Sequence, residues 1–148
     1  MPELPEVETV RRGLEAKLVG RVVARVQRRR DNLRAPLPRN LKGRLEGRRL
    51  GRIDRRGKYL LFHFDDGAVL IAHLGMSGRF VLSAPPTLPG THDHVVIEWD
   101  RGPVLTFNDA RRFGFMTLAR AASWCALVAR TAARSAATSL AARTAASA

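Results

Sequence analysis

The stretch 58-KYLLFHFDDGAVLIAHL-74 indicates most clearly how this chain folds. Two runs of mainly aliphatic and aromatic residues, 58–64 and 68–74, flank the polar turn sequence Asp-Asp-Gly at 65–67. Large apolar residues favour a pleated, half-buried surface, whereas Asp and Gly favour tight turns. The stretch therefore predicts a β-hairpin.

Further strands are expected on both sides of this hairpin. Gly47 and Gly51 should bracket a turn into the β region, which begins at about Leu50. Short apolar runs separated by turn sequences predict the other strands, at 21–30, 79–82, 94–99, 104–108 and 115–118.

Helical patterns occur in two places. Apolar residues recur at spacings of three and four over 4–18, which predicts an amphipathic helix, and Asn40 is a possible N-cap of a short helix through Leu45. The strands follow one another through hairpin turns and do not alternate with helices. We therefore predict an α+β domain, an antiparallel β-sandwich flanked by helices.

The charge of the chain favours a nucleic acid as its partner. The 148 residues carry 26 Lys and Arg against 13 Asp and Glu, a net charge of +13, and only Lys17, Lys42 and Lys58 are lysines. The planar fork of arginine suits phosphate oxygens. The alternative is that the arginine bias reflects the base composition of the gene and only solvates the surface.

The sequence gives no sign of a membrane segment, a disulfide or a metal site. The N-terminus MPELPEVETV lacks the basic and apolar parts of a signal peptide, so we expect a cytoplasmic protein that does not bind membranes. Cys125 is the single cysteine, and His92-Asp93-His94 has no further ligand at a suitable spacing. We expect no metal or other cofactor in this chain and interpret 92–94 as a structural loop.

The chain divides at residue 120. All acidic residues precede this point, and 121–148 is an Ala-rich segment with Ser, Thr and three arginines. We expect one domain at 1–120, followed by a low-complexity tail that is a marginal helix or disordered and has no function of its own.

Five motifs carry a family resemblance. MPELPEVETVRRGL, RRGKYLLF, AHLGMSGRF, HDHV and NDARRFG occur in this order over residues 1–114, and together they resemble the N-terminal catalytic domain of the bacterial formamidopyrimidine-DNA glycosylases. These repair enzymes remove oxidised purines. In the family, this β-sandwich domain is followed by a helix–two-turn–helix domain and a four-cysteine zinc finger that holds the family's zinc. Neither follows residue 120 here, which we interpret as truncation or an out-of-frame reading.

The resemblance assigns the catalytic roles. Removal of Met1 would leave Pro2 as a secondary amine with a pKa of about 8, which is partly neutral at pH 7 and can attack a sugar C1′. Taken alone, Pro2 is more simply a helix-start residue. By resemblance, Glu3 is the general acid/base, Glu6 is a supporting carboxylate, and Lys58 contacts a phosphate near the lesion. The alternatives are acids attracted to a helix N-terminus and a solvated strand-end lysine.

By the same resemblance, Met76, Arg111 and Phe113 fill the space that a flipped nucleotide leaves in the duplex. The alternatives are a Met and a Phe that cap the core and a surface arginine. His73, Arg112 and His94 complete the expected DNA-binding set. Ala110 stands where the family usually has proline, so the loop that carries Arg111 is expected to be less rigid.

The resemblance implies a monomeric, bifunctional DNA glycosylase and abasic-site lyase. Its substrate would be duplex DNA with abasic sites or oxidised purines such as 8-oxoguanine and formamidopyrimidines. Leu4 favours this branch over the endonuclease VIII branch, which usually has glycine there. Without the helical domain and the zinc finger we expect weak or undetectable turnover. The alternatives are a non-catalytic basic DNA-binding remnant and a frameshifted product that folds poorly.

Overall fold

The computed structural model describes residues 4–30, 33, 37–85, 88–112 and 114–120, so the expected tail, Pro2, Glu3 and Phe113 lie outside the described residues. The described part begins with helix α1 (Leu4–Leu18), strand β1 (Val23–Arg28) and the short helix α2 (Leu41–Leu45). The remaining strands are β2 (Leu50–Arg56), β3 (Tyr59–Phe64), β4 (Ala68–His73), β5 (Gly78–Ser83), β6 (Asp93–Trp99), β7 (Val104–Asp109) and β8 (Phe115–Arg120).

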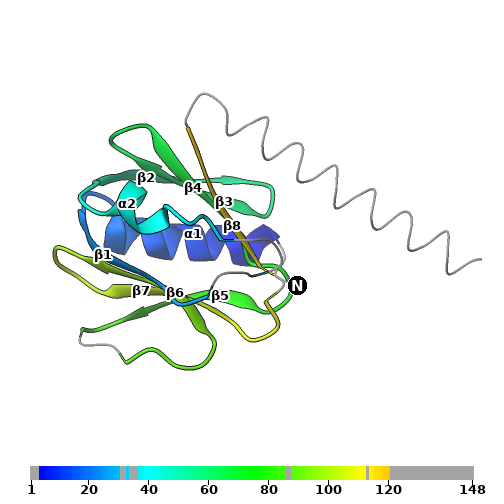
Figure 1. Ribbon diagram of the computed structural model, residues 1–148. Helices are drawn as coiled ribbons and strands as arrows, with labels where there is room; N and C mark the ends of the chain where they lie inside the picture. The colour runs from blue at the N-terminus through cyan, green and yellow to red at the C-terminus, as the bar shows by residue number, and fades with distance from the viewer. Residues whose placement is uncertain (1–3, 31–32, 34–36, 86–87, 113, 121–148) are drawn as a thin grey trace, which may run out of the picture.

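The strands form two antiparallel sheets, with the orders β1-β6-β7-β5 and β2-β3-β4-β8. In Figure 1 the sheet β1-β6-β7-β5 is the lower layer and the sheet β2-β3-β4-β8 is the upper layer. Helix α1 runs at a height between the two sheets. The hairpin read from 58–74 is β3–β4, in which Tyr59 pairs with His73 and Leu61 with Ile71. The prediction of an α+β antiparallel sandwich is confirmed.

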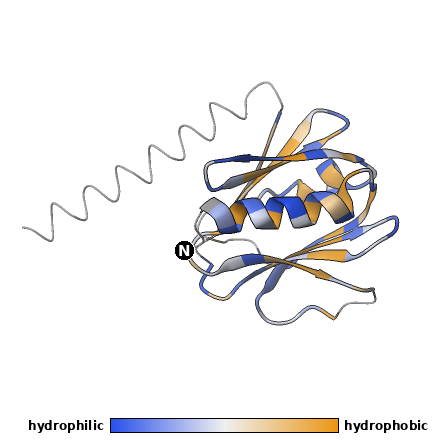
Figure 2. Cartoon of the chain, turned by 180° about the vertical axis from the view of Figure 1, so that it is seen from behind, coloured by the Kyte–Doolittle hydropathy of each residue, from blue (hydrophilic) through white to orange (hydrophobic). Residues whose placement is uncertain are grey.

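The core lies between the sheets and is closed on one side by α1. Alternate residues of each strand point into it, such as Leu60, Phe62 and Phe64 of β3, and the helix adds Leu14 and Leu18. The hydropathy colours of α1 change along its length in Figure 2, as the three- and four-residue spacing of its apolar residues requires. The helix is therefore packed as part of the sandwich.

Three local expectations need correction. The helix at 41–45 is present, but the Asn40 side chain makes no capping hydrogen bond. Gly47 lies in a turn with a φ of +82°, whereas Gly51 lies within β2, where the pairing with β3 is irregular. β5 pairs with β7 rather than with β6, the next strand in the chain, so the fold is not made of successive hairpins alone. Among the described residues, no helix is long and apolar enough to cross a membrane.

Candidate active site and nucleic-acid interface

Three segments that are far apart in the sequence meet at one end of the sheet β2-β3-β4-β8. Lys58 directly precedes β3, and its neighbour Tyr59 pairs with His73 at the end of β4. His73 also pairs with Phe115, the first residue of β8. The turn after β4 and the loop before β8 therefore lie at the same end as Lys58, and these are the segments that carry Met76 and Arg111.

The turn after β4 presents Met76 to solvent. Gly75 has a φ of +63°, and the N–H of Gly78 donates to the carbonyl oxygen of Leu74 at 2.8 Å, which closes the turn. A Cβ on Gly78 would lie 2.3 Å from that same oxygen, so only glycine fits there. The Met76 side chain is 59% exposed. The alternative of a core-capping methionine is wrong, because Met76 projects from the fold.

The loop before β8 presents two exposed arginines, Arg111 and Arg112. Arg112 has a φ of +60°, a conformation that costs free energy for any residue with a side chain. Gly114 is packed against the core, where a Cβ would lie 2.6 Å from Cζ of Phe107. The loop is thus anchored at Gly114 while its guanidinium groups stay accessible.

The two expected histidines have different environments. The His73 ring lies 4.8 Å from that of Tyr59 between centroids, and its Nδ1 accepts from the N–H of Gly75 at 3.0 Å. His73 therefore supports the turn that carries Met76. His94 is only 1% exposed, and its Nε2 lies 2.6 Å from the carbonyl oxygen of Asp109. The expectation that His94 contacts DNA is wrong, because the folded core encloses its ring.

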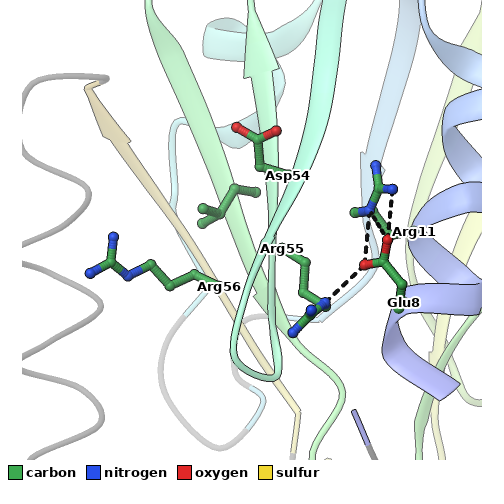
Figure 3. A pocket seen from close by; sticks show the side chains of 6 residues that line it. Glu8, Arg11, Asp54, Arg55 and Arg56 are labelled. Atoms are coloured by element: carbon green, nitrogen blue, oxygen red, sulfur yellow. Dashed lines mark hydrogen bonds and ion pairs between the residues drawn. The ribbon is translucent and has the colours of Figure 1, made fainter. Parts of the chain in front are cut away.

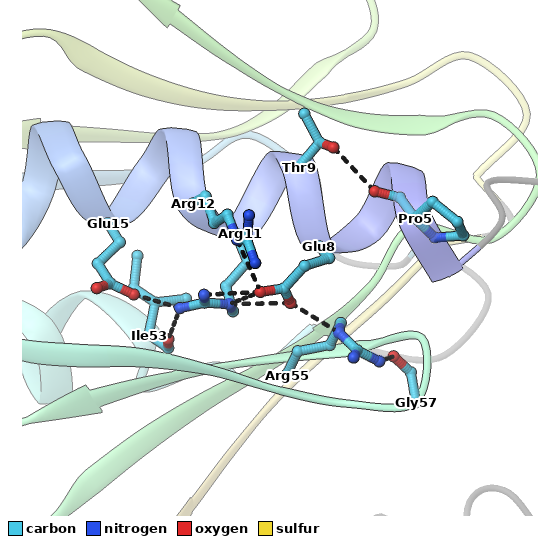
Figure 4. A network of polar contacts seen from close by, with 9 residues as sticks. All are labelled: Pro5, Glu8, Thr9, Arg11, Arg12, Glu15, Ile53, Arg55 and Gly57. Carbon is cyan, nitrogen blue, oxygen red and sulfur yellow. Dashed lines mark hydrogen bonds and ion pairs between the residues drawn. The ribbon is translucent and has the colours of Figure 1, made fainter.

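The N-terminal helix is tied to the strand that leads to Lys58. Glu8 accepts hydrogen bonds from Arg11 on α1 at 2.7 Å and from Arg55 on β2 at 2.8 Å, as Figure 4 shows. The Arg55 guanidinium also donates to the carbonyl oxygen of Gly57, beside Lys58. Hydrogen bonds from Arg11 and then Arg55 lower the pKa of Glu8 to about 2. This network places the start of α1 next to the turn that carries Lys58.

Sequence reasoning did not single out Glu8, although its spacing to Arg11 is typical of a helical ion pair. Together with Asp54, Arg56 and Leu61, the Glu8 network lines a shallow polar depression between α1 and β2 (Figure 3). The depression contains none of the predicted catalytic residues, so we interpret it as structural. Glu6 lies exposed in the first turn of α1.

No cluster of three or more His, Cys, Asp or Glu side chains suited to a metal ion occurs in the described part of the chain. The end of the sheet described above carries Lys58, the two exposed arginines Arg111 and Arg112, and the exposed Met76. Cationic groups suit phosphates, and an apolar wedge suits the space between bases. The arrangement fits a nucleic acid.

Comparisons with known proteins identify the family of this domain. A family model described as "Formamidopyrimidine-DNA glycosylase N-terminal domain" matches residues 1–116. The chain is 53% identical over 129 residues to the formamidopyrimidine-DNA glycosylase of Rhodospirillum centenum, an alignment that covers 80% of this chain and 44% of the relative. It is also 53% identical over 127 residues to that of Dinoroseobacter shibae, which covers 80% and 45%.

Solved structures agree as well. The Lactococcus lactis enzyme in complex with DNA containing FAPY-dG superposes with a TM-score of 0.79 at 33% identity, covering 86% of this chain and 48% of that one. The complex of the same enzyme with DNA containing an abasic site gives a TM-score of 0.78 at 34% identity, covering 87% and 48%. The chain spans less than half the length of these relatives. Over that span the sequence and the fold agree with these relatives, and the chain belongs to the formamidopyrimidine-DNA glycosylase family, whose N-terminal domain it carries.

Proposed function

We propose that this chain supplies the catalytic half of a bifunctional DNA glycosylase and abasic-site lyase acting on oxidised purines in duplex DNA. One observation carries the proposal: Lys58, Met76 and Arg111, which are widely separated in the sequence, lie on segments at the same end of one sheet. Those are the positions that match the family's catalytic and void-filling residues. The names of the relatives support the substrate class.

The chemistry begins at Pro2. With Met1 removed, the neutral secondary amine attacks C1′ of the damaged nucleotide, and the C1′–N bond to the base breaks as the new C–N bond forms. The base leaves with a proton from a general acid, and the attacking amine loses its own proton. The C1′–O4′ bond then breaks as O4′ takes up a proton, which leaves the opened sugar as an iminium ion. Glu3 is the candidate for these proton transfers, with Glu6 in support.

Strand cleavage follows from the same intermediate. The iminium cation withdraws electrons and makes the C2′ proton acidic, so a base can remove it while the 3′ phosphate departs. Lys58, half-buried beside β3, is the candidate for binding the phosphate next to the lesion. Water then hydrolyses the iminium and restores the Pro2 amine. The glycosylase and the lyase thus share one covalent intermediate.

Void filling is the second part of the proposal. Extrusion of a nucleotide costs a few kcal/mol of stacking and pairing, which protein groups inserted into the gap offset in part. Met76 is already exposed at its turn, so its side chain is accessible to a bound duplex. Arg111 would hydrogen-bond the base left without a partner, Phe113 would wedge beside it, and Arg112 would bind a phosphate.

A second candidate function is DNA binding without turnover, which the net charge of +13 alone would support. Such binding would weaken steeply with salt and show no preference for lesions. Because the chain is shorter than its relatives, the experiment has to separate these two candidates on the 148-residue protein itself.

The test is borohydride trapping on a duplex that contains one abasic site, with the 148-residue chain from which Met1 has been removed. We expect a covalent protein–DNA adduct that disappears when the N-terminal amine is blocked by acetylation. A folded chain with a free Pro2 that gives no adduct would contradict the proposal and leave DNA binding as the function.

A further inference from the structure

The carboxylate of Asp109 joins the two loops of the site. The residue is 0% exposed, at the end of β7. Its Oδ1 accepts from the hydroxyl of Ser77 in the Met76 turn and from the N–H of Arg112 at 3.0 Å. Its Oδ2 accepts from the N–H of Gly114 at 2.6 Å. One side chain therefore holds the Met76 turn and the Arg111 loop together.

Ser77 adds a second link between the same loops. Its hydroxyl oxygen donates to Asp109 and accepts from the N–H of Arg111 at 3.2 Å. The backbone of Arg111 thus depends on Asp109 through Ser77. Asp109 also bonds the strained Arg112 directly, which helps to maintain the positive φ of that residue.

The buried carboxylate of Asp109 needs a structural reason at the proposed DNA-binding end, because a negative charge near bound DNA repels the phosphates. Burial of a carboxylate is also unfavourable unless hydrogen bonds replace its water. The donors described above supply such bonds to both oxygens, and they can do so only while both loops keep their present conformation. The arrangement therefore favours one fixed geometry of the two loops.

We propose that Asp109 is a positioning residue that fixes the Met76 turn and the Arg111 loop as one rigid unit, so that both side chains meet the damaged site together. What the loops contact rests on the function proposed above. The hydrogen bonds that hold the loops do not depend on that function, so the positioning role and the proposed function can fail independently.

The first test measures backbone amide hydrogen exchange by NMR in the full chain. In Asp109→Asn the side-chain NH2 replaces one acceptor oxygen and faces a donor, so we expect the Arg112 or Gly114 amide to exchange at least about tenfold faster. The control is Asp66→Asn, which makes the same charge change in the 65–67 turn, where Asp66 accepts from the N–H of Ala68. Unchanged protection of both amides in a folded Asp109→Asn protein would overturn the proposal.

A milder pair of variants covers the case in which Asp109→Asn fails to fold. Ser77→Ala removes the hydroxyl that accepts from Arg111, and we expect several-fold faster exchange of the Arg111 amide. Ser77→Thr keeps a hydroxyl and should restore the protection. Equal exchange of that amide in wild type, Ser77→Ala and Ser77→Thr would contradict the link between the loops.

The second test measures affinity for a duplex with a tetrahydrofuran abasic-site analogue and for the same duplex undamaged, at fixed salt. We expect the ratio of affinities for damaged over undamaged duplex to be several-fold lower in Asp109→Asn than in wild type. Binding to undamaged DNA should not weaken, because the variant has one negative charge fewer. A retained preference alongside fast amide exchange would overturn the positioning role. If wild type shows no preference, the proposed function fails, and the exchange data alone decide how the loops are held.

Discussion

Substitution of Gly114 by alanine should strongly destabilise the domain. The added Cβ would lie 2.6 Å from Cζ of Phe107, 2.7 Å from Oδ2 of Asp109 and 3.1 Å from the carbonyl oxygen of His73. Carbon atoms in contact prefer separations of about 3.5–4.0 Å, so the loop must move by nearly 1 Å. That movement would also stretch the 2.6 Å hydrogen bond from Gly114 to Asp109.

The expected cost follows from these two effects. Overpacking costs about 1–3 kcal/mol, and loss of a hydrogen bond to a charged group costs about 1.5–3 kcal/mol. The sum is about 2.5–6 kcal/mol, a large part of the roughly 5–15 kcal/mol that stabilises a typical domain. For a domain of this size we expect Tm to fall by about 10–20 °C.

The assay is thermal unfolding followed by circular dichroism, with Gly13→Ala as the control. Gly13 lies exposed within α1, and a Cβ there would meet nothing within 4 Å. Alanine at that position should stabilise the helix by up to about 1 kcal/mol and raise Tm. If Gly114→Ala unfolds within about 2 °C of wild type, the close packing described for this loop is incorrect.

Two further predictions concern Glu8 and Met76. Arg11 and Arg55 lower the pKa of Glu8 from 4.5 to about 2, so the Glu8 carboxylate stabilises the fold fully above pH 4.5 and loses this effect as the pH falls through about 2. The free energies of unfolding in urea of wild type and Glu8→Gln should therefore differ at pH 6 and converge at pH 2. An equal difference at both pH values would refute the assignment. Met76→Ala should change the free energy of unfolding by no more than about 0.5 kcal/mol, because Met76 is 59% exposed. The same variant should lower the preference for an abasic duplex over an undamaged one. The control is Leu88→Ala, at a 95% exposed apolar residue outside the site, which should change neither quantity.

Much of the fold follows from short-range patterns. The β3–β4 hairpin and α1 could be predicted because a turn sequence and a helical spacing are visible within fewer than twenty residues. The pairing of β5 with β7 could not, because strands that are not successive are selected by how the whole core packs. The Asn40 cap failed for a similar reason, since a capping residue type does not determine side-chain geometry.

The candidate site shows the same division. Motifs predict Lys58, Met76 and Arg111 as site residues, and the sheet register explains why their segments lie at one end. Asp109 was missed because its link to Ser77 spans 32 residues and leaves no local pattern. His94 was misread because a histidine in a polar motif looks accessible until the strands enclose it. Pro2, Glu3 and Phe113 stay predictions.

The hairpin geometry also offers a practical attachment point. The 65–67 turn lies at the far end of β3 from Lys58, about 20 Å away at the usual rise per residue. The β6–β7 turn at 100–103 lies likewise at the far end of its strands from Asp109. A fluorophore, an affinity tag or a surface tether placed in either turn would leave the opposite end open to a long duplex. Immobilised protein could then be presented to DNA in a single orientation.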